Sequence, residues 1–241
     1  MDYDGDGTLD MISGCYDPGF VYLFRGLGKG KYEKIATILD KNGDPVTHHL
    51  GPEKGEGGKA AYNNPEKFGS WPALVDWDDD GDLDLLIGSF AGKVFLRANE
   101  GTRAKPLFAG TPVGLTSGKK TLAVNGHANP VAADWDGDGI WDLVVGASDG
   151  GVVWFRNAGT KKQPSFEEAR ALVEAKSKDK FLSVKADEKP RPGVRAQICV
   201  ADYDLDGKLD LILGDFAEVQ GRDRGKGSRQ SFVWLYRRRS P

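Results

Sequence analysis

One nine-residue pattern occurs four times in the chain and constrains its fold more than any other feature. Each copy has Asp at its first, third, fifth and ninth positions, Gly at the sixth and an apolar residue at the eighth. Each copy then runs into apolar residues and a Gly. The copies, called here Asp loops 1 to 4, span residues 2–10, 76–84, 134–142 and 202–210. Four copies in one frame indicate a repeated structural unit.

Each Asp loop predicts a calcium site. Carboxylates this close repel one another and raise each other's pKa values, and a divalent cation removes that cost. Calcium takes about six to eight oxygen ligands, and Asp at positions 1, 3 and 5 with a carbonyl at position 7 is a known way to supply them. The alternative, an acidic surface turn that binds nothing, fits one copy better than four. The expected ligands of up to four structural Ca²⁺ ions are Asp2, Asp4, Asp6, Asp10, Asp76, Asp78, Asp80, Asp84, Asp134, Asp136, Asp138, Asp142, Asp202, Asp204, Asp206 and Asp210, with the carbonyls of Thr8, Asp82, Ile140 and Lys208.

The pattern is not an EF-hand. An EF-hand loop requires a bidentate Glu at position 12 and flanking helices, whereas position 12 here is Ser13, Ile87, Val145 or Leu213. Short apolar runs such as 72–75 and 83–87 flank the loops. Short runs of β-branched residues bounded by Gly and Asp are typical of strands. We therefore expect each loop to close a strand–loop–strand hairpin.

The spacing of the loops predicts four-stranded units. A third strand follows each hairpin at 20–24, 93–96, 151–155 and 232–236, and a fourth follows in the first three units. Antiparallel four-stranded units repeated around an axis form a β-propeller. The expected fold class is therefore all-β, a propeller with repeat units at about 1–70, 71–128, 129–193 and 194–241 in a single domain spanning 1–241.

These residues resemble the FG-GAP/VCBS repeat family, the calcium-loop propellers of integrin α-subunit heads and of many secreted bacterial proteins. The motif Asp-x-Asp-x-Asp-Gly-x-x-Asp-Leu and its trailing Gly occur in all four units, with Met11 in place of the Leu in the first. The Phe-Gly that opens the family repeat is present only at Phe68 and Gly69. The resemblance implies the propeller fold, calcium as the cofactor and a role in adhesion or binding.

The first and last units are incomplete by this pattern. The first begins inside its Asp loop and the fourth stops after its third strand, so we expect a fragment of a larger propeller or a chain that closes by self-association. A closed ring of four blades is the alternative. Because Met1 leads directly into the first loop, we expect no signal peptide within this chain. No run approaches the ~20 apolar residues of a membrane span. An extracellular, cell-surface or periplasmic location is expected because calcium is abundant there.

Charge and cysteine content constrain the partners only loosely. Removing the sixteen predicted loop carboxylates from the formal net charge of −3 leaves +13, a basic surface that either serves solubility or attracts polyanions. We expect no nucleic-acid partner. The two cysteines, Cys15 and Cys199, are too few for a disulfide framework and are expected to be small buried apolar residues rather than a bridge.

Function is expected on the rim opposite the Asp loops, where insertions at 44–70, 176–194 and 215–231 fall. Loops on a rigid scaffold commonly carry binding residues, and the expected partner is an extracellular carbohydrate or protein. No catalytic arrangement is apparent, so the chain is expected not to be an enzyme; a polysaccharide lyase or hydrolase, or a purely structural scaffold, is the alternative. The candidate ligand-binding residues are Arg222, Arg224, Lys226, Arg229, His48 and His49.

Overall fold

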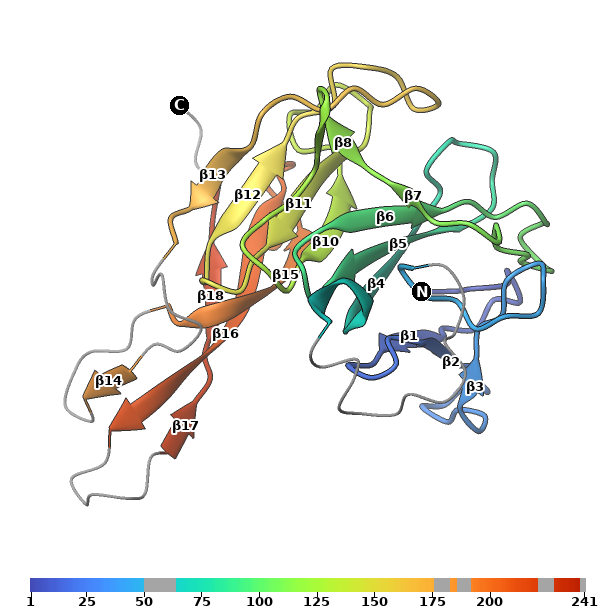
Figure 1. Cartoon of the computed structure of the whole chain (residues 1–241), viewed down its shortest axis with the longest axis horizontal. Helices are drawn as coiled ribbons and strands as arrows, with labels where there is room; N and C mark the ends of the chain where they lie inside the picture. The colour runs from blue at the N-terminus through green and yellow to red at the C-terminus, as the bar shows by residue number, and fades with distance from the viewer. Residues whose placement is uncertain (50–63, 176–182, 186–191, 221–227, 239–241) are drawn as a thin grey trace.

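The computed structural model describes residues 1–49, 64–175, 183–185, 192–220 and 228–238. Within them the fold is all-β: short antiparallel sheets follow one another along the chain, as Figure 1 shows, joined by turns and by one short 3₁₀ helix, η1 (Pro65–Lys67). The sheets have the strand order and pairing of propeller blades, which confirms the expected fold class. None of the helices in the described residues has the length and apolar character needed to cross a bilayer.

The second and third units are complete four-stranded blades. Blade 2 has the order β4 (Ser70–Val75), β5 (Asp84–Ser89), β6 (Val94–Arg97) and β7 (Val113–Gly114). Blade 3 repeats it with β10 (Asn129–Ala133), β11 (Asp142–Gly146), β12 (Val152–Phe155) and β13 (Arg170–Val173). Consecutive strands pair antiparallel in both. The predicted hairpin around each Asp loop, and the third and fourth strands, are therefore present.

The first and fourth units each contribute three blade strands. Blade 1 consists of β1 (Met11–Gly14), β2 (Val21–Phe24) and β3 (Ala36–Thr37). Blade 4 consists of β15 (Val194–Ala201), β16 (Asp210–Gln220) and β18 (Val233–Tyr236). The far end of β16 leaves the blade and pairs with β14 (Ser183–Lys185) and β17 (Ser228–Gln230), and Figure 1 shows this part projecting away from the other sheets. A small hairpin, β8 (Thr116–Ser117) with β9 (Lys120–Thr121), lies between blades 2 and 3 in the chain.

The core lies between neighbouring blades. Successive residues of a strand point to opposite faces of its sheet, and the middle strand of blade 2 uses both faces. Leu85 and Ile87, both fully buried, pack against blade 1, whereas Leu86 packs against blade 3. In blade 3, Leu143 faces blade 2 and Val144 faces blade 4. This alternation explains why the second strand of each inner unit is an uninterrupted apolar run.

The Gly that ends each of these apolar runs permits close approach of the next blade. A Cβ added to Gly14 would lie 2.0 Å from the carbonyl oxygen of Ser70, and one added to Gly88 would lie 1.9 Å from that of Ala128. Gly146 has the same relation to Ala196, at 2.3 Å. The three contacted residues lie at or next to the first strand of the following blade. Any side chain at the Gly would therefore push the two blades apart.

The cysteine prediction is half correct. Both thiols are free, as expected. Cys199, however, is exposed and Cys15 is only partly buried. Because side chains alternate along β15, Cys199 lies on the opposite side from Ile198 and Val200, which pack in the core between blades 3 and 4. A short apolar run in an outer blade therefore does not imply burial of every member.

Candidate metal centres

The four Asp loops occupy equivalent places in the fold. Asp loops 2, 3 and 4 connect the first and second strands of their blades, and Asp loop 1 leads directly into β1. The registers place them at one end of the sheets. In blade 2, Val75 pairs with Asp84 beside the loop, whereas Ser70 pairs with Ser89 at the far end. Ala133 with Asp142, and Ala201 with Asp210, hold the same position in blades 3 and 4.

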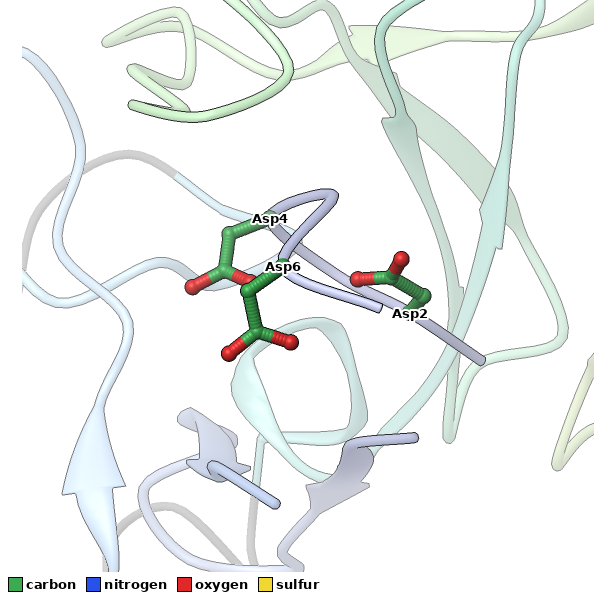
Figure 2. Close-up of side chains that lie close together, drawn as sticks. All are labelled: Asp2, Asp4 and Asp6. Atoms are coloured by element: carbon green, nitrogen blue, oxygen red, sulfur yellow. The ribbon is translucent and has the colours of Figure 1, made fainter. Parts of the chain in front are cut away.

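In every loop the first, third and fifth carboxylates converge. Each of the three offers an oxygen within 4.8 Å of the others, and Figure 2 shows the arrangement for Asp2, Asp4 and Asp6. The same grouping holds for Asp76, Asp78, Asp80; Asp134, Asp136, Asp138; and Asp202, Asp204, Asp206. Twelve of the sixteen predicted carboxylates are thus brought together in threes, as the spacing predicted.

Main-chain N–H groups hold these carboxylates in place. The two oxygens of Asp134 accept hydrogen bonds from the N–H groups of Gly137 (2.8 Å) and Gly139 (2.9 Å), and Asp138 accepts one from Ile140 (3.0 Å). The first and fifth Asp of the other loops accept equivalent bonds. The first carboxylate thereby wraps the loop around itself and is oriented by the backbone.

Two positions of each loop adopt the left-handed conformation, and the sequence indicated only one of them. Position 6 is always Gly, with φ between 84° and 95°. Position 4 is also left-handed, but it is Gly in loops 1 and 3, Asp79 (φ 65°) in loop 2 and Leu205 (φ 60°) in loop 4. A left-handed conformation costs a residue with a Cβ about 1–2 kcal/mol. Loops 2 and 4 therefore carry backbone strain that loops 1 and 3 avoid.

The ninth carboxylate serves a different purpose from the other three. Asp142 is fully buried, and its oxygens accept hydrogen bonds from Asn157 N (2.7 Å) and Trp154 Nε1 (2.9 Å). Asp10, Asp84 and Asp210 each accept one bond from the N–H of the second residue of their own loop and one from the N–H of the second residue after the third strand. This Asp fastens the loop to the third strand. Its predicted role as a fourth ligand stays a prediction, since the structure groups only the other three.

The pKa values in loop 2 reflect burial first and neighbouring negative charge second. Burial raises the pKa of Asp84 to about 6, against the opposing effect of its hydrogen bonds from Asn99 and Trp77. Burial, followed by the charges of Asp80, Asp78 and Asp76, also raises the pKa of Asp82. These shifts are the electrostatic cost that a bound cation would remove.

The donor set fits a hard cation such as calcium. Oxygen atoms of Asp4, Asp82 and Asp136 are buried without a hydrogen-bond partner within the part of the chain that the structure describes. Buried carboxylate oxygens without partners are costly. A divalent ion bound by oxygen ligands would satisfy those of Asp4 and Asp136, which belong to the converging groups. Bound there, calcium would supply charge neutralisation and cross-linking of the loop, held by the first, third and fifth Asp.

Arginines that directly follow the third strands also contact the loops, and sequence reasoning missed them. Arg156 pairs with Asp136 (2.5 Å) and Asp138 (2.9 Å), and the hydrogen bond with Asp136 is the main reason that the pKa of Arg156 is raised. Arg25 forms an ion pair with Asp4, and Arg237 lies 3.5 Å from Asp204. The sequence offered one signal: the residue directly after the third strand is Arg in three units and Ala in the other.

Asp loops 1, 2 and 3 are each also tied to the following unit. The indole Nε1 of Trp141, in loop 3, donates to the carbonyl of Asp76 in loop 2 at 2.7 Å. Arg103 of unit 2 donates to the carbonyl of Asp2 at 2.6 Å, and Arg238 of unit 4 donates to the carbonyl of Trp135. These three hydrogen bonds, called here the rim contacts, link all four units along the Asp-loop side.

Comparison with known families now identifies the repeat. The family model of the FG-GAP-like repeat matches residues 76–145 and again 134–213, which together cover more than half of the chain. The chain belongs to the FG-GAP-like repeat family. Its matches each run from one Asp loop to the second strand of the next blade, so Asp loops 2, 3 and 4 lie inside FG-GAP-like repeats. A search of curated proteins finds no match.

The structure does not place the candidate ligand-binding residues together on a surface that it describes. Arg222, Arg224 and Lys226 lie outside the described residues. Arg229 lies in β17, and its side chain is not described. His48 is only 1% exposed, and its Nε2 lies 3.0 Å from the carbonyl oxygen of Glu66. Burial, with the nearby His49, lowers the pKa of His48 to about 4. His48 is thus a core residue and does not present its ring on the rim.

A groove opens on the end of the blades opposite the Asp loops. Two adjoining hollows, of about 330 and 510 Å³, share Tyr16, Trp71 and Gln197 in their linings. Tyr16 is 46% exposed and stands edge-on to Trp71, which stacks on the buried His127. All four units contribute to this rim groove, which is lined by Ile12, Ser13, Gly14, Cys15, Tyr16, Gly69, Ser70, Trp71, Pro72, Asn129, Arg195, Gln197, Gly214, Asp215, Phe216, Ser231, Phe232 and Val233.

Proposed function

We propose that this chain is a calcium-stabilised binding module that works outside the cytosol and holds a carbohydrate in the rim groove. The observation that carries the proposal is the division of the blades into two ends. Asp loops that can be cross-linked by metal occupy one end, and a groove built by all four units lies at the other. A rigid scaffold with a binding surface on its loops is a common arrangement in binding proteins.

The composition of the groove supports a sugar as the ligand. Tyr16 offers a half-exposed aromatic ring beside Trp71, and aromatic faces provide apolar contact area next to polar groups. Gln197 and Asn129 place amide groups around it, which suits the hydroxyl groups of a sugar. A protein segment is the competing ligand, and it would use the same surface.

A calcium role outside the cytosol agrees with the chemistry of the loops. Oxygen-rich loops of extracellular modules bind calcium with dissociation constants of about 10⁻⁴–10⁻³ M, which suits millimolar calcium. The proposed role is non-enzymatic. Release of reducing ends or unsaturated products from an acidic polysaccharide incubated with the calcium-loaded chain would overturn it.

A glycan array tests the proposed ligand. The chain is applied in 2 mM calcium (a concentration on the order of that outside cells), and we expect Tyr16→Ala to lose at least tenfold in binding. Tyr32→Ala is the matched control, because Tyr32 is also partly exposed (39%) and does not line the groove. Retention by no glycan, or equal binding by both variants, would refute a carbohydrate ligand in the groove.

A further inference from the structure

The position that follows the third strand differs among the four units. Four residues are equivalent here, because in each unit the next N–H group donates to the ninth carboxylate of its own Asp loop. The residues are Arg25, Ala98, Arg156 and Arg237. Three units thus direct a guanidinium toward their Asp loop, whereas the second presents only a methyl group.

The three arginines contact the carboxylates that converge in the loops. Arg156 bridges the third and fifth Asp of loop 3, and the pair is largely shielded, with side-chain exposures of 29% for Arg156 and 21% for Asp136. Arg25 pairs with Asp4, whose side chain is 6% exposed. Arg237 is 61% exposed and lies 3.5 Å from Asp204, which makes it the weakest of the three contacts.

Asp loop 2 has more negative charge and less compensation. It contains six carboxylates between residues 76 and 84, whereas each of the other loops contains four. Among the described residues no cation pairs with Asp76, Asp78 or Asp80. The ion pair that loop 2 does make joins Lys161 to Asp79, which is not one of the three converging residues.

We infer that Asp loop 2 is the tightest calcium site of the chain, and that Arg25, Arg156 and Arg237 act as built-in counter-ions that weaken calcium binding at the other three loops. The inference rests on the proposed calcium role. A cation entering loop 3 must displace the guanidinium of Arg156 from Asp136 and Asp138, so part of its binding free energy is spent on breaking that pair. No such contact has to be broken at loop 2, and the affinity of oxygen-ligand loops rises with ligand charge.

The same arginines give the loops a second property. A guanidinium between two carboxylates reduces their mutual repulsion. Loops 1, 3 and 4 therefore keep part of their closed geometry without calcium, whereas loop 2 depends on the ion. As the calcium concentration falls, loops 1, 3 and 4 would lose their ions first, and loop 2 would lose its ion last.

Native mass spectrometry with a calcium titration tests this order. We expect one ion to bind at least tenfold more tightly than the next, and Asp78→Ala to remove that first binding step. Ala98→Arg should weaken the first step about tenfold. Arg156→Gln should strengthen one later step by a similar factor and leave the first unchanged. Lys41→Gln is the control, because Lys41 pairs with Glu100 away from the loops.

The outcomes separate this inference from the calcium role itself. Binding of no calcium would overturn both. Binding of four ions with one common affinity, or a first step that survives Asp78→Ala and Ala98→Arg, would overturn only the order. The melting temperature of Arg156→Gln is also measured by circular dichroism in calcium-free buffer. We expect it to be lower than that of the wild type and to be restored by calcium. If Arg156 had a packing role alone, the variant would melt lower but none of its calcium-binding steps would become tighter.

Discussion

Replacing Asp142 by Asn tests whether the ninth carboxylate fastens its Asp loop to the blade. Asp142 is fully buried and accepts one hydrogen bond at each oxygen, from Asn157 N and Trp154 Nε1. Asn has one acceptor oxygen, and its NH₂ group would face one of these two N–H donors. The substitution therefore loses one bond to a charged group and leaves a buried donor unpaired, at a cost of about 2–4 kcal/mol. Burial raises the pKa of Asp142, which means that burying its charge costs free energy. The neutral Asn avoids this desolvation cost, so we expect a loss in the lower half of that range.

Urea unfolding followed by tryptophan fluorescence measures this cost, once in EDTA and once in saturating calcium. The bonds exist without metal, so the loss in unfolding free energy should appear in both conditions. Glu33→Gln serves as the control, since Glu33 is an exposed carboxylate on blade 1. A variant within about 0.5 kcal/mol of the wild type in EDTA, the range of ordinary surface substitutions, would refute the fastening role. Loss of one bound calcium in the same variant would show that Asp142 is also a ligand.

Four further predictions follow from the loops and the core. Chelation by EDTA should lower the melting temperature by about 5–10 °C, because calcium at 100 times its dissociation constant contributes about 2.7 kcal/mol; an unchanged melt by calorimetry would contradict a structural role of the metal. Leu205→Gly should stabilise the chain by about 1 kcal/mol in urea unfolding, because Leu205 is 87% exposed and left-handed; a loss of stability would show that its φ carries no strain. Gly88→Ala should destabilise by at least about 2 kcal/mol, since its Cβ would lie 1.9 Å from a backbone oxygen, and wild-type stability of the purified variant would refute the close approach. The pKa of His48 is lowered from 6.5 to about 4, so its neutral form stabilises the fold fully above pH 6.5 and about 3 kcal/mol is lost as the pH falls toward 4; His48→Gln should flatten this part of a pH–stability curve measured in saturating calcium, and an identical slope would assign the loss to other groups.

The repeats and their strands were predictable because the constraint is local. Four Asp at fixed positions, a Gly and an apolar run determine a hairpin without reference to the rest of the chain. The convergence of the first, third and fifth Asp follows from the same spacing. The trailing Gly was visible as a pattern, but its reason, the contact with a carbonyl of the next blade, depends on how two blades pack.

What the sequence did not reveal depends on partners that are distant along the chain. Arg156 is 20 residues from Asp136, and nothing in its neighbourhood marks it as a counter-ion. His48 was assigned to the rim because it lies in a long insertion, yet it is buried against Phe95 and bonded to the carbonyl of Glu66. Tyr16 and Gln197 come together in the groove only because blades 1 and 4 converge there. Periodicity carries no information on such contacts.

The rim contacts have a consequence for how such chains grow. In each of the three junctions a side chain of the later unit reaches a main-chain carbonyl of the earlier one, and the acceptor lies in the first two residues of an Asp loop. Every loop offers that carbonyl whatever its side chains are. A duplicated unit inserted into the array would therefore meet a main-chain acceptor in the preceding unit and would carry its own side-chain donor. The number of units could thus change by gene duplication without substitutions in the existing units.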